Sequence, residues 1–195
     1  MKKIVLATSN PHKVEEINAI VKDIEIQFVL PEGEFDPIED GKTFEENSLI
    51  KASEAHRLTG LPTLADDSGL CVDALDGAPG IHSARYADSA DKRIQKLLDA
   101  LKDVPNEKRQ AKFVCAMTLL DESGKVVFAD RGECLGKIGF EAKGTNGFGY
   151  DPIFVVDGKN LAMAELPEGE KNLISHRAIA LQKLIAFLNT NYKQA

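Results

Sequence analysis

The stretch Leu64–Leu70, Leu-Ala-Asp-Asp-Ser-Gly-Leu, places two adjacent carboxylates directly after apolar residues. That order is typical of a buried strand that ends at a polar site. Two ionised aspartates repel each other, so at a half-buried strand end we expect either a raised pKa for one of them or a cation beside them. Magnesium is the expected cation, because it prefers oxygen ligands and needs only one or two protein carboxylates when a phosphate supplies the rest. A solvated turn is the alternative, since Asp, Ser and Gly are common turn residues.

Length and composition limit the class of protein. The 195 residues carry a net charge of −7 and suit one domain, or one domain with two lobes. Because binding to nucleic acid or to a membrane surface needs a basic face, we expect neither partner. No apolar run approaches a membrane span and no signal peptide is recognisable, so we expect a cytoplasmic protein. Cys71, Cys115 and Cys134 are expected to be buried thiols rather than disulfides or a zinc site.

The beginning of the chain predicts a strand, a polar turn and a helix. An apolar run over Lys3–Ala7 is followed by a polar segment that ends with Asn10, Pro11, His12 and Lys13. Asn10 as N-cap and Pro11 at the first helical position favour a helix start. Free amides at such a start attract phosphate, and Lys13 adds a positive charge. A plain connection with a surface lysine is the alternative.

A second strand is predicted over Ile24–Leu30, followed by an acidic loop that contains Glu39. Thr43 and the glutamates after it have the form of a capping box, which predicts a helix to about Leu58. Asn47 and Lys51 are four residues apart and therefore share one face of this helix. A surface pair is the usual fate of two such residues, and a pair that reaches into a site is the alternative.

The middle of the chain decides the type of sheet. Asp91–Lys102 carries an apolar stripe typical of an amphipathic helix. Ala111–Leu120 and Val126–Cys134 are β-rich runs separated by a short turn, which predicts an antiparallel hairpin. Parallel units at the start and a hairpin in the middle together predict an α/β fold with a mixed sheet flanked by helices.

Two later segments are candidates for ligand binding. In the glycine-rich loop Gly144–Pro152 an aromatic side chain could stack on a base, and Asp151 could accept a hydrogen bond from a ring N–H. A packed glycine-rich hairpin is the alternative. Ser175 is the predicted N-cap of the last helix, which places His176 and Arg177 in its first turn. Cations are unfavourable there, so a nearby anion or carbonyl-bearing ligand would offset their cost.

Four motifs occur in the order and spacing of a known family. They are Thr8-x-Asn10-x-x-Lys13, Ala65-Asp66-Asp67-Ser68-Gly69-Leu70, Gly147-Phe148-Gly149-Tyr150-Asp151-Pro152 and Ser175-His176-Arg177. Together they resemble the inosine triphosphate pyrophosphatase family, also called Ham1-like, from about Lys3 to Leu188. Ser9 and His12 occupy positions that are often glycine or variable in that family. The resemblance implies an elongated mixed α/β domain over residues 1–195 with two lobes, a central cleft and a homodimeric state.

The same resemblance implies an activity. Family members are magnesium-dependent hydrolases that convert ITP, dITP and XTP to the monophosphate and pyrophosphate, which removes deaminated purines from the nucleotide pool. By position, the resemblance implies that the phosphates are bound by Thr8, Ser9, Asn10, Pro11, His12 and Lys13. It implies that Glu39 and Asp67 bind magnesium, that Asp67 is the general base, and that Lys51, Ser68 and Lys171 contact the substrate. It also implies a base pocket formed by Phe148, Gly149, Tyr150 and Asp151, with the base recognised by His176 and Arg177.

The chemistry agrees with that reading, because attack on phosphorus needs charge neutralisation and an oriented water more than a covalent intermediate. Arg177 as a donor suits the 6-oxygen of hypoxanthine or xanthine and is left unpaired by the 6-amino group of adenine. Two alternatives remain open. One is a Maf-like pyrophosphatase that acts on pyrimidine or modified nucleotides, and the other is a non-catalytic nucleotide-binding protein.

Overall fold

The computed structural model describes residues 2–9, 14, 17, 18, 21, 26–33 and 35–191. The chain divides into two compact units. The first unit comprises Met1–Asp67, Cys115–Arg131 and Ala180–Ala195, and the second comprises Ser68–Val114 and Gly132–Ile179. The predicted single domain with a central cleft stays a prediction. Within the described residues, no helix is both long and apolar enough to span a membrane.

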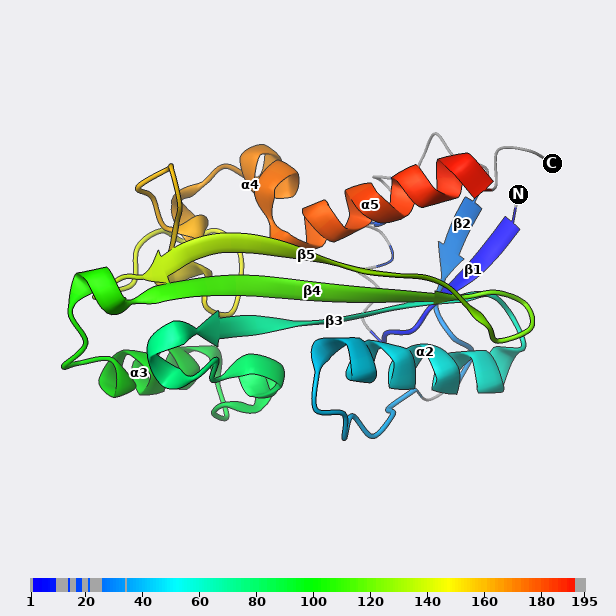
Figure 1. The fold of residues 1–195 in the computed structure, drawn as a ribbon, viewed down its shortest axis with the longest axis horizontal. Helices are drawn as coiled ribbons and strands as arrows, with labels where there is room; N and C mark the ends of the chain where they lie inside the picture. Colours follow the sequence, from blue (N-terminus) through cyan, green and yellow to red (C-terminus); the bar gives the residue numbers. More distant parts are fainter. Residues whose placement is uncertain are drawn as a thin grey trace. The chain divides into compact units, whose positions relative to one another are not determined.

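The strands form one six-stranded sheet in the order β2-β1-β3-β4-β5-β6, which can be followed in Figure 1. Their bounds are β1 Lys2–Leu6, β2 Ile26–Val29, β3 Thr63–Val72, β4 Gln110–Leu120, β5 Val126–Ile138 and β6 Phe154–Val156. β1 is parallel to β2 and to β3, whereas β5 and β6 are antiparallel. The helices are α2 Phe44–Thr59, α3 Ala90–Ala100, α4 Glu168–Ile174 and α5 His176–Asn191. The predicted mixed sheet flanked by helices is therefore confirmed.

The first unit buries both faces of its strands, because successive side chains of a strand point to opposite faces. One face of β1 and β3 packs against α5 through a core that includes Ile4, Leu6, Leu64, Leu181, Leu184 and Leu188. The other face packs against α2 through a smaller core that includes Val5, Ala7, Ala65, Ala52 and Ala55. Figure 1 shows α2 and α5 on opposite sides of these strands. Parallel strands buried on both faces explain why β1 reads as a continuous apolar run.

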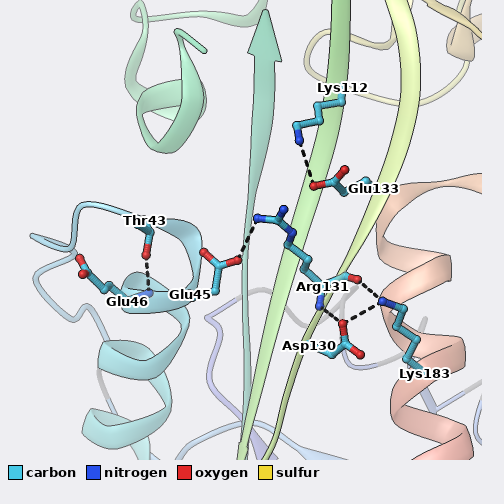
Figure 2. Close-up of polar contacts among 8 residues, drawn as sticks. All are labelled: Thr43, Glu45, Glu46, Lys112, Asp130, Arg131, Glu133 and Lys183. Carbon is cyan, nitrogen blue, oxygen red and sulfur yellow. Dashed lines mark hydrogen bonds and ion pairs between the residues drawn. The ribbon is translucent and has the colours of Figure 1, made fainter. Parts of the chain in front are cut away.

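Local signals fix both ends of α2. The hydroxyl of Thr43 accepts from the backbone N–H of Glu46 at 3.1 Å, a pair drawn in Figure 2. The carboxylate of Glu46 accepts in turn from the N–H of Lys42 at 2.6 Å, one residue earlier than in an ordinary capping box. At the other end Gly60 adopts a left-handed φ of 66° and donates to the carbonyl of His56. The predicted helix and its cap are confirmed.

Ion pairs join α2 and α5 to β5 in the first unit (Figure 2). The guanidinium of Arg131 lies 3.3 Å from the carboxylate of Glu45 on α2. The ammonium of Lys183 on α5 donates to the carboxylate of Asp130 at 2.8 Å and to the carbonyl of Arg131 at 2.7 Å. These side chains are about half exposed, so each pair contributes roughly 1 kcal/mol or less to stability.

The second unit has a core of its own, formed by residues of β3, α3, β4, β5 and β6. Leu97 and Leu101 are fully buried there, which confirms the apolar stripe predicted for α3. Arg109 is 1% exposed, although the sequence gives no hint that it is buried. Its guanidinium donates to the carbonyls of Leu101, Val104, Ile138 and Gly139. A buried cation is tolerated here because four carbonyl dipoles accept from it.

The cysteines agree largely with the prediction. All three are free thiols, and Cys115 and Cys134 are buried. Cys71 is only half-buried, so the prediction of three buried thiols is wrong for this residue. Burial, with smaller contributions from Asp157 and Asp151, raises the pKa of the Cys134 thiol to about 11. Cys134 is therefore protonated at neutral pH and is not a nucleophile.

Candidate active site

The two aspartates lie within β3 and not at its end. β3 continues through Ser68 and Gly69 to Val72, so the predicted strand end is wrong. Asp66 is 4% and Asp67 8% exposed, so a solvated turn is excluded as well. The physical reason is the position of β3 in the sheet, between β1 and β4. β1 pairs with β3 at Thr63 and Leu64, before the aspartates, so the pairing with β4 keeps the backbone extended through the polar residues.

A lysine lies between two of the predicted magnesium ligands. The ammonium of Lys51 lies 3.1 Å from Oδ1 of Asp67 and 3.4 Å from Oε1 of Glu39. All three belong to the first unit. α2 positions Lys51, because the hydroxyl of Ser48 donates to the carbonyl of Ala65 at 3.1 Å and is hydrogen-bonded to the hydroxyl of Thr118 at 3.0 Å. These buried bonds fix the register of α2 against β3 and β4.

The pKa values of Asp67 and Lys51 are both raised, but for different reasons. Burial raises the pKa of Asp67, opposed by the charge and hydrogen bonds of Lys51 and Asn47 and assisted by the charge of Glu39. Burial acts to lower the pKa of Lys51, but the nearby charges of Asp66, Asp67 and Glu39 outweigh it and the pKa is raised. Three carboxylates therefore surround one ammonium, and the cluster is negative overall when all are ionised.

In the second unit the glycine-rich loop is held by an ion pair. Oδ2 of Asp151 accepts from the ammonium of Lys171 at 2.6 Å and from the backbone N–H of Phe148 at 2.8 Å. The side chain of Asp151 is 6% exposed and that of Lys171 is 17% exposed, so the pair is largely shielded from water. The Phe148 ring is 66% exposed, and the Lys171 ammonium lies 4.8 Å from its centroid. The loop therefore exposes the Phe148 ring, while the Asp151 carboxylate holds the backbone of Phe148 in place.

The residues predicted to read the base lie at the start of α5. Ser175 accepts from the N–H of Ala178 at 3.1 Å, which confirms it as the N-cap. His176 is 9% exposed and stacks on the ring of Phe113, with centroids 4.9 Å apart and planes 14° apart. Arg177 is 8% exposed. Both residues belong to the second unit, and the motif does not indicate the stacking partner of His176.

Tyr150 has a structural role that the motif alone does not reveal. The side chain is 4% exposed, and its hydroxyl donates to the carbonyl of Ser83 at 2.9 Å. Burial raises its pKa to about 12, so the phenol stays protonated. Within the predicted base pocket, Tyr150 anchors the loop to the core, whereas Phe148 provides the exposed surface.

The remaining predicted residues divide into described and undescribed positions. Thr8 follows β1 and is half-buried, Ser9 is exposed, and Ser68 is half-buried on β3. The predicted phosphate-binding residues Asn10, Pro11, His12 and Lys13 lie outside the described residues. Gly149 has a left-handed φ of 63° in the loop of the second unit.

These observations define an α/β protein with a partly buried carboxylate–lysine cluster beside the β3 strand of a mixed sheet. A model of the Ham1 family matches residues 4–187, so the chain belongs to the Ham1 family and the resemblance seen in its motifs is confirmed. The chain is 47% identical to a dITP/XTP pyrophosphatase of Exiguobacterium sibiricum, over 96% of this chain and 98% of that protein. It is 49% identical to a dITP/XTP pyrophosphatase of Vibrio cholerae, over 94% of this chain and 95% of that protein.

Solved structures lead to the same family. The chain matches a HAM1 protein from Coxiella burnetii with a TM-score of 0.91 and 42% identity, over 97% of this chain and all of that one. It matches a nucleoside-triphosphatase or dITP/XTP pyrophosphatase from Mycobacterium abscessus with a TM-score of 0.79 and 43% identity, over 93% of this chain and 98% of that one. The likeness extends over nearly the whole of each chain.

Proposed function

We propose that this chain hydrolyses non-standard purine nucleoside triphosphates, with ITP, dITP and XTP as substrates, to the monophosphate and pyrophosphate. The full-length similarity to dITP/XTP pyrophosphatases supports this activity. The observation that carries it is the partly buried cluster of Glu39, Lys51 and Asp67, which gathers two carboxylates and an ammonium as a hydrolytic site for a triphosphate needs.

The donor set of this cluster suits magnesium. A carboxylate has about four lone-pair sites, and each oxygen of Asp67 accepts one side-chain bond, from Lys51 or from Asn47. Lone pairs therefore remain on both oxygens, and the position of the Lys51 ammonium between Asp67 and Glu39 supports the proposal that this pair holds a cation. The described residues contain no group of three or more His, Cys, Asp or Glu side chains arranged for a metal. Magnesium does not require one, because phosphate and water complete its shell.

In the proposed mechanism Glu39 and Asp67 would hold a magnesium ion. When bound, the ion would neutralise the charge that develops on the phosphates. Asp67 would also accept the proton of the attacking water. Burial raises the pKa of Asp67, which makes this carboxylate a stronger base than an exposed aspartate. Lys51 would stabilise negative charge that develops on the phosphates, because its raised pKa keeps it protonated.

We propose that substrate specificity comes from the second unit. The exposed ring of Phe148 is a stacking surface for a purine. Arg177 can donate to the 6-oxygen of these purines but not to the 6-amino group of adenine, which is itself a donor. The proposed phosphate contacts are Thr8 to Lys13, with Ser68 and Lys171 as further substrate contacts.

The remaining proposals concern the state of the protein. We propose a cytoplasmic homodimer that does not bind nucleic acid, and the net charge of −7 supports the last point. Light scattering coupled to size-exclusion chromatography measures the oligomeric state directly. A monomer at micromolar concentration would contradict the proposed homodimer.

Pyrophosphate release from ITP, XTP, ATP, dTTP and UTP in the presence of magnesium tests the activity. The proposal predicts rapid release from ITP and XTP and little from the other three. A preference for dTTP or UTP would favour the Maf-like alternative. Nucleotide binding without turnover would favour a non-catalytic protein.

A further inference from the structure

Asn47 is completely buried, although the sequence gives it only a place on the same helical face as Lys51. Its side chain makes two hydrogen bonds to groups that are far apart in the sequence. The amide nitrogen donates to Oδ2 of Asp67 at 3.2 Å, and the amide oxygen accepts from the backbone N–H of Gly41 at 2.9 Å. The partners fix the orientation of the amide, because a carboxylate can only accept and a backbone N–H can only donate.

The bond to Gly41 constrains the loop that carries Glu39. Gly41 lies two residues after Glu39, and its close approach to α2 leaves no room for a larger residue. A methyl group at this position would lie 2.6 Å from the amide oxygen of Asn47 and 2.9 Å from Cβ of Glu46. The adjacent N–H of Lys42 is also bound to α2, through the carboxylate of Glu46 at 2.6 Å. One helical turn therefore holds the loop that presents Glu39.

The bond to Asp67 constrains the other carboxylate. Lys51 occupies Oδ1 and Asn47 occupies Oδ2, so both oxygens of Asp67 are oriented by side chains of α2. Ser48, between these two residues in the sequence, fixes the helix to β3 and β4. Rotation of the Asp67 carboxylate would break at least one of the two bonds.

We propose that Asn47 is a positioning residue for the hydrolytic site, and that its amide holds the Glu39 loop and the Asp67 carboxylate at a fixed separation. This inference rests on the proposed function, in which Glu39 and Asp67 hold a divalent ion. Partners that orient metal ligands typically contribute about 10- to 100-fold to metal affinity or activity. Asn47 acts on both ligands at once without touching the substrate.

The test compares two asparagines of the first unit that have the same kind of contacts. In Asn47→Ser the shorter hydroxyl reaches neither partner. Asn18 is the matched control, because its amide also makes one donor and one acceptor bond, both to the backbone of Phe28 at 2.9 Å. Asn18→Ser removes a comparable pair of bonds away from the carboxylates. Circular dichroism and thermal unfolding of both variants report the structural cost alone.

Two functional measurements are made on each folded variant. The first is the binding of Mn²⁺ without nucleotide, measured from the electron paramagnetic resonance of the free ion. The second is kcat and KM for ITP with magnesium. We expect Asn47→Ser to weaken Mn²⁺ binding and to lower kcat by about 10-fold or more, with KM changed less than kcat. We expect Asn18→Ser to change Mn²⁺ binding and kcat by less than about twofold at a similar loss of thermal stability.

Gly41→Ala distinguishes the two hydrogen bonds of Asn47, the one to Gly41 and the one to Asp67. It displaces the Glu39 loop but keeps the donor to Asp67, so we expect weaker Mn²⁺ binding with a smaller loss of kcat than in Asn47→Ser. This variant also decides the question if Asn47→Ser does not fold, since unchanged Mn²⁺ binding in folded Gly41→Ala would overturn the inference.

The outcomes distinguish this inference from the proposed function. If the wild-type chain neither hydrolyses ITP nor binds Mn²⁺, the proposed function fails. If the wild-type chain does both and Asn47→Ser matches Asn18→Ser in Mn²⁺ affinity and kcat, the proposed function stands and the positioning role of Asn47 is wrong.

Discussion

Two glycines of the same loop provide a sharp test of the ion pair in the second unit. Gly147 and Gly149 both have left-handed backbone angles, with φ values of 78° and 63°. An alanine at either position costs roughly 1–2 kcal/mol, because its Cβ is strained in that conformation. The surroundings differ. A methyl group at Gly149 meets no atom within 4 Å, whereas at Gly147 it would overlap the carboxylate of Asp151 and lie 2.7 Å from the ammonium of Lys171.

The expected difference follows from the burial of that pair. Asp151 and Lys171 have side chains that are 6% and 17% exposed. Breaking a buried pair by displacing one partner costs roughly 3–5 kcal/mol, because a charge is left without compensation. We therefore expect Gly147→Ala to lower the free energy of unfolding by about 3–5 kcal/mol more than Gly149→Ala does.

Urea denaturation followed by circular dichroism measures both values. A double-mutant cycle of Gly147→Ala with Lys171→Met identifies the cause, since displacing the Asp151 carboxylate can break the ion pair only while the ammonium is present. We expect a coupling energy of at least about 1 kcal/mol. Equal losses for the two alanine variants, or a coupling energy near zero, would refute the idea that the loop is built on the Asp151–Lys171 pair.

Three further predictions follow from the charges and the burial of single residues. The raised pKa of Lys51 means that its contribution to stability is complete below its unfolded value of 10.5 and is lost only as the pH rises through the folded value. Without Lys51 the pKa of Asp67 rises further, because the charge that opposes the effect of burial is gone. Lys51→Met should lower the free energy of unfolding in urea more at pH 8 than at pH 5, where Asp67 can bind a proton, and equal losses would contradict this. Iodoacetamide at pH 7.5 should modify Cys71 before Cys134, because a pKa of about 11 leaves only about 0.03% of Cys134 as thiolate. Peptide mass spectrometry that finds Cys134 modified first would be inconsistent with the burial of this thiol. Arg177→Ala should reduce the ratio of kcat/KM for ITP over ATP by about tenfold or more, and an unchanged ratio would place base readout elsewhere.

The sequence predicted those parts of the fold that depend on local signals. The helix α2 was predictable because Thr43 and Gly60 determine its ends through contacts within a few residues. The end of β3 was not predictable from Asp66 and Asp67, because the strand continues past them beside β4, which is distant in the sequence. Polar residues are therefore a weak indicator of a strand end when a neighbouring strand pairs with their backbone.

The buried polar residues show the same limit. Asn47 resembles a surface residue in a helical pattern, but its partner Asp67 is 20 residues away. Arg109 resembles any charged residue before a strand, but it donates to carbonyls as far away as Gly139. Tyr150 resembles a base-contacting aromatic by its motif, but its hydroxyl binds Ser83. A buried polar group is identified by its hydrogen-bond partners, and a single sequence does not reveal which distant residues are those partners.

The family resemblance located more of the candidate site than periodicity did. It brought Glu39, Lys51 and Asp67 into one hypothesis, and the structure places these three within contact distance of each other through Lys51. Neither helical spacing nor strand alternation could relate the acidic loop to a residue of β3. Their roles in catalysis stay predictions that depend on measured activity.

The most direct measurement is the rate of pyrophosphate release from ITP by Asp67→Asn, with the fold of the variant checked by circular dichroism. The substitution keeps the shape of the side chain but removes the charge and the basic oxygen. Our account predicts a folded protein that has lost about a thousandfold or more of the wild-type kcat. A folded variant that releases pyrophosphate at a near wild-type rate would contradict the assignment of Asp67 to the reaction.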